Sequence, residues 1–148
     1  MNPDTDCQDY LNRLPHGPEF RFLDKLLDLD PGKLGVGEYR VRGDEPFLRG
    51  HFPGDPIFPG VLLLEAAAQL AGLVAQSDPA IPPWPVLKLT AVRSAKITGA
   101  ARPGDVIRLE ATVVARLGNL IQAATRARIA DTIVLTADFA LSGEKPNP

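Results

Sequence analysis

The sequence is poor in the features that mark secreted and nucleic-acid-binding proteins. Its 148 residues include one cysteine, Cys7, so no disulfide can form within the chain and a reducing compartment is expected. The formal net charge is only −2. No dense stripe of lysine and arginine with interleaved aromatic residues occurs, which argues against nucleic acid as a partner.

Long apolar runs are also missing. The longest, from Val61 to Ala75, is interrupted by Glu65 and Gln69 and is shorter than the roughly 20 residues of a membrane-spanning helix. The N-terminal fifteen residues are polar and acidic, so no secretory signal peptide is indicated. We therefore expect a soluble cytoplasmic protein without a membrane span.

Strand patterns dominate the second half of the sequence. Apolar residues alternate with polar ones along 106–116, 121–129 and 133–141, and short turns join these segments. Alternation of period two with short connections predicts an antiparallel meander. Residues 87–97 are expected to add one more strand.

The first half is less regular. One strand is expected within residues 20–29 and a second over 34–41, in which the apolar residues change face at a β-bulge near Gly37. The length of the chain fits one domain, which we place at residues 11–142. Residues 1–10 and 143–148 are expected to be flexible ends.

One segment, from Gly60 to about Ser77, is strongly helical. Its polar residues Glu65, Gln69 and Gln76 form a single row together with Gly72. A solvated helix face is broader than one row, so this helix is expected to be buried on almost all sides. One buried helix with an antiparallel sheet around it constitutes an α+β arrangement.

The stretch GHFPGDPIFPGVLLLEAAAQ, residues 50–69, leads directly into this helix. A proline stands at every third position of the loop, at Pro53, Pro56 and Pro59, and fixes its path. The helix then keeps a single carboxylate, Glu65, near its start. A rigid loop beside a buried acid is typical of an active site.

His51 is the candidate general base in this stretch. It lies between Gly50 and Phe52 in the stiffened loop, and an imidazole gains and loses its proton near neutral pH. The alternative is a loop histidine that only makes a hydrogen bond. The other histidine, His16, is expected to be structural.

Glu65 is the candidate acid, and the alternative is a solvent-facing glutamate. Its apolar neighbours favour the neutral carboxylic acid, whereas the helix N-terminus favours the anion, and the sequence leaves open which prevails. Gln69, one turn later, is placed to orient the carboxyl group by a hydrogen bond.

Gly60, at the first turn, offers an unpaired N–H at the positive end of the helix. A substrate carbonyl placed there would be polarised, and the lack of a Cβ would let it approach closely. The alternative is an ordinary Pro-Gly helix start. A base, an acid and an oxyanion donor converge on proton removal beside a carbonyl with loss of a hydroxyl as water.

These residues resemble the β-hydroxyacyl-[acyl-carrier-protein] dehydratases of type II fatty-acid synthesis, of the FabZ kind. Their signature GHFPGxPxMPGVLxxEAxAQ is similar to residues 50–69, with Phe58 in place of the methionine. LPHGPEF, residues 14–20, is similar to their LPHRxPF. RPGDVIRLEATVVARLGNL, residues 102–120, resembles their xPGDxLxLExxxxxxRxxI. The similarity covers most of residues 11–141.

The resemblance implies a hot-dog fold, in which an antiparallel sheet wraps around one long central helix. It implies a homodimer that joins two sheets, usually assembled further into a hexamer as a trimer of dimers. It also implies dehydration of a (3R)-3-hydroxyacyl chain to the trans-2-enoyl chain on acyl carrier protein as partner, with no metal or organic cofactor.

In residues, the resemblance implies that His51 is the base and Glu65 the acid, meeting across the dimer interface, with Gly60 supplying the carbonyl-binding N–H. Glutamate at position 65 is similar to the dehydratase branch, because the branch that also isomerises the double bond carries aspartate there. The residues expected to support these groups are Gln69, Phe52 and Pro59.

Two further sets of residues are candidates. Those for lining the acyl tunnel are Phe58, Leu62 and Ala66, although apolar helix residues are more often core. Those for docking the acidic carrier protein are Arg93, Lys96 and Arg102, although such charges are often only solvated.

The sequence departs from the family pattern in three places. Residues 96–101 replace a basic KFRxPV, Gly17 stands where arginine is common, and residues 87–89 offer no counterpart of the tunnel-gating tyrosine of some relatives. The open alternatives are a hot-dog thioesterase, a CoA-linked hydratase and a non-catalytic subunit that binds the acyl carrier. The preferred acyl length and the pathway are not indicated.

Overall fold

The computed structural model describes residues 3–144, with side chains from residue 7 onward. The parts of the expected flexible ends at residues 1–2 and 145–148 lie outside the described residues. The elements follow in the order α1 (Pro3–Asn12), η1 (Pro18–Phe20), β1 (Lys25–Asp30), β2 (Leu34–Arg40), η2 (Pro46–Arg49), α2 (Gly60–Ala75), β3 (Val86–Ile97), β4 (Val106–Leu117), β5 (Leu120–Ile129) and β6 (Thr132–Glu144).

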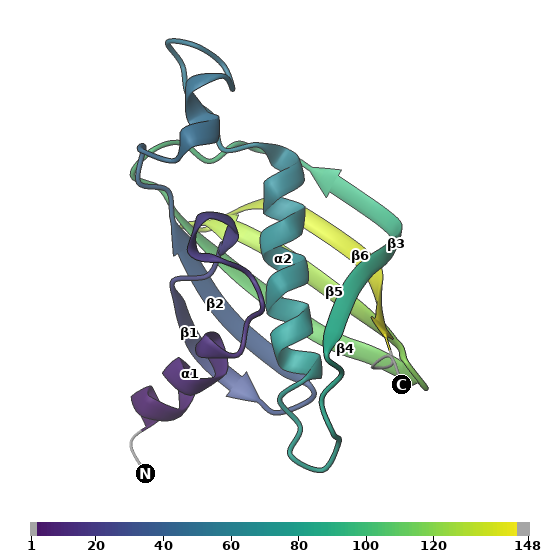
Figure 1. Cartoon of the computed structure of the whole chain (residues 1–148). Coiled ribbons are helices and arrows are strands. Elements are labelled where there is room, and N and C mark those ends of the chain that lie inside the picture. Colours follow the sequence, from purple (N-terminus) through teal and green to yellow (C-terminus); the bar gives the residue numbers. More distant parts are fainter. Residues whose placement is uncertain (1–2, 145–148) are drawn as a thin grey trace.

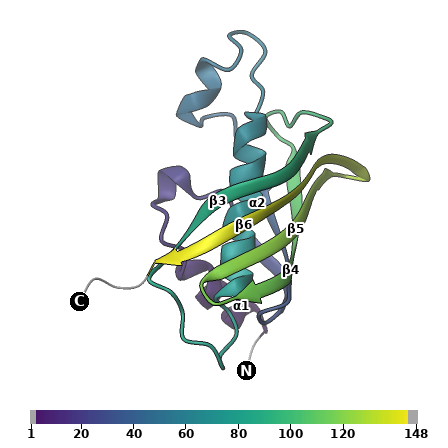
Figure 2. The same ribbon diagram turned by 90° about the vertical axis from the view of Figure 1, so that its right-hand side faces the viewer.

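The six strands form one sheet in the order β1-β2-β4-β5-β6-β3, and every neighbouring pair is antiparallel. Helix α2 lies along one face of this sheet (Figure 1). Seen from the side, the sheet curves around the helix (Figure 2). The predicted sheet wrapped around one long helix is confirmed, including the meander β4-β5-β6.

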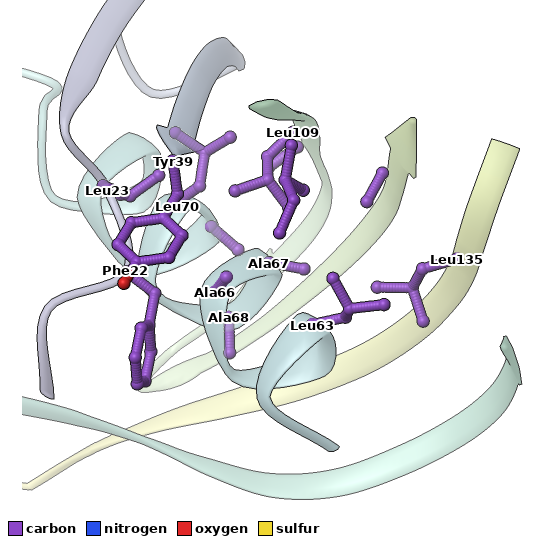
Figure 3. Close-up of a cluster of buried hydrophobic side chains, with 14 of the residues drawn as sticks. Phe22, Leu23, Tyr39, Leu63, Ala66, Ala67, Ala68, Leu70, Leu109 and Leu135 are labelled. Atoms are coloured by element: carbon purple, nitrogen blue, oxygen red, sulfur yellow. The ribbon is translucent and has the colours of Figure 1, made fainter. Parts of the chain in front are cut away.

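The hydrophobic core fills the space between α2 and the sheet (Figure 3). Leu63 and Leu70 of α2 are completely buried there, as are the short side chains of Ala66 and Ala67. Alanines at these positions let the helix backbone approach the strands, and the leucines fill the remaining volume. The expectation of a helix buried on almost all sides is confirmed, because most of its residues are inaccessible.

Strand β2 differs from the expected pattern. Its buried positions alternate without a break and include Gly35, Gly37 and Tyr39. The apolar Leu34 and Val36 therefore lie on the outer face and Tyr39 on the core face, and β2 pairs with β4 without a bulge. The two glycines point toward α2, and a Cβ on Gly35 would lie only 2.5 Å from Cγ2 of Val74. The register shift expected near Gly37 lies on the neighbouring strand β1. The apolar pattern did not predict this strand's core face correctly, because two of its three core-facing positions, 35 and 37, are glycines.

The ends of the chain are more ordered than expected. Residues 3–12 form helix α1 where we predicted a flexible segment, and Leu11 and Leu14 are buried against the core. Buried leucines anchor such a segment. Residues 143–144, assigned to the flexible tail, belong to β6 and pair with β3. The strand expected within 20–29 begins only at Lys25.

Strand β3 forms one edge of the sheet, and within residues 3–144 its one pairing partner is β6. Its twelve residues are mostly exposed, and the apolar side chains of Leu89, Val92 and Ile97 are among them. A long apolar edge strand is a template for pairing with another chain. Within residues 3–144, no helix has the length and apolarity needed to cross a membrane.

Candidate active site

His51 belongs to the segment between η2 and α2, and this segment extends beyond the N-terminal end of α2 (Figures 1 and 2). The N–H of His51 donates to the carbonyl of Leu48 at 3.3 Å, and its own carbonyl accepts the N–H of Ile57 at 2.9 Å. The ring atom Nδ1 lies 2.8 Å from the carbonyl oxygen of Ile57. A carbonyl only accepts, so Nδ1 carries the hydrogen and Nε2 is left as a bare nitrogen that can take up a proton.

A buried carboxylate holds the start of this loop. Oε1 of Glu45 accepts the N–H of Arg42 and the hydroxyl of Tyr39, both at 2.8 Å, and Oε2 accepts the N–H of Gly43 at 2.8 Å. Burial by itself raises the pKa of Glu45, but these hydrogen bonds outweigh it and the pKa is lowered. Burial and the bond to Glu45 raise the pKa of Tyr39. The sequence analysis did not identify Glu45.

Glu65, in the second turn of α2, faces a cavity of about 560 Å³. Gln69 is buried one turn later, and its Nε2 donates to Oε1 of Glu65 at 3.2 Å. The same amide donates to the carbonyl of Phe20 at 2.8 Å and accepts the N–H of Phe22 at 2.9 Å. Gln69 makes the hydrogen bond expected of it and fixes the Glu65 side chain to the N-terminal segment.

His16 approaches the same carboxyl group. Its Nε2 lies 3.4 Å from Oε1 of Glu65, and both side chains are about one quarter exposed. We expected only a structural role for this histidine. The LPH motif at residues 14–16 singled out His16. Its contact partner, Glu65, is 49 positions away in the chain, so the motif gave no indication of the contact.

The row of residues identified on the helix lines the cavity. Glu65, Gln69, Gly72 and Gln76 all border it, opposite Trp84 and the start of β3. Oε1 of Gln76 accepts the N–H of Trp84 at 2.6 Å, and its Nε2 donates to the Trp84 carbonyl at 2.9 Å. This pair of hydrogen bonds joins α2 to the segment that leads into β3, and both residues line the cavity.

The start of α2 carries the other predicted groups. The N–H groups of Leu62 and Leu63 both donate to the carbonyl of Pro59. The N–H of Gly60, at the first position of α2, has no backbone acceptor within the described residues. A Cβ on Gly60 would lie 2.9 Å from Cδ1 of Ile97. This strand residue already fills the space, so the missing Cβ serves packing here rather than the close approach of a ligand.

Phe52 is exposed, and its ring centroid lies 4.6 Å from that of His51. It therefore flanks the imidazole without burying it.

The tunnel candidates do not border the cavity. Phe58 is 1% exposed and packs in an aromatic cluster with Phe22, Tyr39 and Phe47, and Ala66 is completely buried. Both belong to the hydrophobic core of this chain, and a role in lining the acyl tunnel stays a prediction. Neither borders the cavity, because the helix row that faces it begins at Glu65. The third candidate, Leu62, is half-buried against the core.

The docking candidates Arg93, Lys96 and Arg102 are exposed. Arg102 forms an ion pair with Asp55 of the His51 loop, which gives it a local partner. The side chains described from residue 7 onward include no cluster of three or more His, Cys, Asp or Glu placed to hold a metal ion.

The structure thus brings Glu65, Gln69 and His16 together at one cavity, whereas His51 is not among the residues that line it. The base and the acid inferred from the sequence occupy different places in one chain. Each is held by hydrogen bonds that define its orientation.

The sequence is similar to known dehydratases over nearly its whole length. Residues 14–138 match the family model described as a FabA-like domain. Proteins named 3-hydroxyacyl-[acyl-carrier-protein] dehydratase FabZ are similar from end to end. That of Chloroflexus aggregans is 35% identical over 94% of this chain and 96% of its own, and that of Yersinia enterocolitica is 35% identical over 99% and 89%.

Solved structures share the fold at low identity. The dehydratase heterocomplex ApeI:P from Xenorhabdus doucetiae has a chain that superposes with a TM-score of 0.78 at 18% identity, covering 93% of this chain and 91% of that one. Zebra fish thioesterase superfamily member 2 superposes with a TM-score of 0.69 at 15% identity, covering 97% and 99%. These likenesses identify the hot-dog fold.

Proposed function

We infer the roles of His51 and Glu65 from the fact that this chain belongs to the FabA-like family, whose matching members remove water from a 3-hydroxyacyl chain on acyl carrier protein. We propose that this enzyme does so with His51 as base and Glu65 as acid. The observation that carries the proposal is that the Ile57 carbonyl holds Nδ1 of His51, which leaves Nε2 for proton transfer, while Glu65 faces a cavity.

In the proposed reaction, Nε2 of His51 takes the proton from the carbon next to the thioester carbonyl. The electron pair of that C–H bond forms the double bond, the C–O bond at carbon 3 breaks, and the oxygen leaves as water with the proton of Glu65. A (3R)-3-hydroxyacyl chain becomes a trans-2-enoyl chain. The imidazolium of His51 then releases one proton to solvent and the carboxylate of Glu65 takes one up, which restores both groups.

We propose that the N–H of Gly60 stabilises the transition state of this reaction. Charge accumulates on the thioester oxygen as the proton leaves, and a fixed donor at a helix N-terminus stabilises it. The support is that the N–H of Gly60 lies in the first turn of α2 and has no backbone acceptor among the described residues. The carbonyl of Pro59 holds the first turn, and Phe52 flanks the imidazole.

The complete site is proposed to form between two chains. Because His51 does not line the cavity that Glu65 faces, the base would come from the partner subunit. The unpaired edge of β3, with its exposed apolar residues, supports a dimer in which two sheets join at this strand. Assembly into a hexamer of three such dimers is proposed by resemblance.

The acyl chain is proposed to occupy the cavity along α2. Glu65 and Gln76 border it and are 11 residues apart, which is about 16 Å of helix at 1.5 Å per residue. Leu87, Leu89 and Leu141 line it, as does Trp84, which is hydrogen-bonded to Gln76. We propose acyl carrier protein as the partner, docking near Arg93, Lys96 and Arg102, and a cytoplasmic location.

The proposal is tested by following the absorbance of the conjugated enoyl thioester on mixing the enzyme with 3-hydroxyacyl-carrier substrates of several lengths. We expect product from the wild type and none from the folded variants His51→Ala and Glu65→Ala. Full turnover in both variants would refute the assignment. Release of free thiol instead of enoyl product would identify a thioesterase.

A further inference from the structure

The carboxyl group of Glu65 has one crowded oxygen. Oε1 lies 3.2 Å from Nε2 of Gln69 and 3.4 Å from Nε2 of His16, whereas the described residues place no side-chain donor on Oε2. The two neighbours come from different elements, since Gln69 is on α2 and His16 precedes η1.

The surroundings of His16 determine which of its nitrogens carries hydrogen. Nδ1 is buried and meets no hydrogen-bonding partner among the described residues, so a hydrogen there would be a buried donor without an acceptor. Nε2 faces a carboxyl oxygen, which accepts. The neutral ring with hydrogen on Nε2 therefore fits this site, and both neighbours of Oε1 are donors.

Other charged groups at the cavity have different partners. Arg13 stacks on the ring of Tyr10 at 4.6 Å, and Nζ of Lys88 lies 2.6 Å from Oε1 of Glu144. The His16 segment is also held in place, because Nη2 of Arg21 donates to the carbonyl oxygens of Leu14 and His16. Among the described side chains, His16 and Gln69 are left to act on Glu65.

We infer that His16 is a positioning residue for the dehydration, donating from Nε2 to Oε1 of Glu65 so that the proton of the acid stays on Oε2. The leaving hydroxyl then receives that proton from a fixed direction. When Glu65 has given it up, the two donors on Oε1 stabilise the carboxylate. The inference rests on the proposed function, in which Glu65 is the acid.

Two amide substitutions separate this role from packing. Nε2 of glutamine is the same number of bonds from Cα as Nε2 of histidine, so His16→Gln keeps a donor toward Glu65. The amide of asparagine corresponds instead to Nδ1, so His16→Asn keeps a polar side chain but removes that donor. The two variants are matched in chemistry and differ in the position of the donor.

We expect His16→Asn to lower kcat by about 10- to 100-fold, the range for one hydrogen bond to a charged group, with KM close to that of the wild type. His16→Gln should keep kcat near wild type, and both variants should melt at similar temperatures. In the background of Glu65→Gln, adding His16→Asn should cause no further loss of residual turnover.

Two results would overturn the inference and leave the proposed function intact: wild-type kcat in His16→Asn, or equal loss in His16→Gln and His16→Asn. Wild-type turnover in Glu65→Gln would overturn the proposed role of the acid, and this inference with it.

Discussion

Replacing Glu45 by glutamine tests whether the loop of the catalytic base is held as described. The carboxylate accepts three hydrogen bonds at 2.8 Å, two on Oε1 from Arg42 and Tyr39 and one on Oε2 from Gly43. Glutamine keeps one oxygen, which can still accept the first two. Its NH₂ group then faces the N–H of Gly43, so two donors oppose each other.

The cost follows from these three bonds. The hydrogen bonds from Arg42 and Tyr39 remain but go to a neutral oxygen, which lowers the free energy of unfolding by about 1 kcal/mol for each bond. The N–H of Gly43 loses its partner, at about 1 kcal/mol, the low end of the range for an unsatisfied donor because Gly43 is exposed to water. Together the substitution should destabilise the fold by about 3 kcal/mol, or about 6 to 12 °C in Tm for a chain of this size.

The effect should depend on pH with a definite sign. The pKa of Glu45 is lowered from its ordinary value of 4.5 in the folded protein, so the carboxylate stabilises the fold fully above that value. The contribution is lost as the pH falls through the lowered pKa. The difference in Tm between wild type and variant should therefore be complete at pH 7 and shrink in acid.

The assay is thermal unfolding at fixed protein concentration, with kcat measured at a temperature where both proteins are folded. Loosening the loop that carries His51 should lower kcat by up to about 100-fold. The exposed Glu19→Gln is the matched control and should leave both quantities unchanged. If Glu45→Gln behaves like this control at pH 7, the loop is not held by Glu45.

Three other substitutions have expected outcomes. Gly35→Ala would place a Cβ 2.5 Å from Val74 and should cost about 1 to 3 kcal/mol in chemical denaturation; an unchanged midpoint would show that α2 does not pack on β2 this closely. Trp84→Ala removes the indole from the lining of the cavity while keeping the backbone bonds to Gln76 and should shift kcat/KM toward longer acyl chains; an unchanged length profile would place the acyl chain elsewhere. Reversing the charges of Arg93 and Lys96 should raise KM for carrier-bound substrates but not for short synthetic thioesters, and equal effects on both would exclude this docking surface.

Periodic features of the fold were predictable from the sequence. In β4 and β5, side chains alternate between core and solvent, so the period-two pattern identified them directly. In β2 the period-two pattern did not identify the core face, because glycine stands at the core-facing positions 35 and 37. Side chains of α2 fill the space beside Gly35, so the sequence shows no apolar residue there. Helix α1 was missed because its polar sequence is held by Leu11 near its end.

The site was predictable only where its residues are close in the sequence. Gln69 is one turn from Glu65, so their hydrogen bond followed from helical spacing. The approach of His16 to Glu65 depends on how the N-terminal segment folds over α2, which no local pattern reports. The packing of the Phe58 ring against Phe22 likewise joins segments that are far apart in the sequence.

The most direct test of the central claim is the activity of a mixture of two inactive variants, His51→Ala and Glu65→Ala, produced together at equal levels. A site that takes His51 from one subunit and Glu65 from the other is intact once in every mixed dimer. Half of the dimers are mixed and each has one intact site of two, so the account predicts about a quarter of wild-type turnover. Turnover no higher than that of either variant alone, from well-folded mixed dimers, would contradict it.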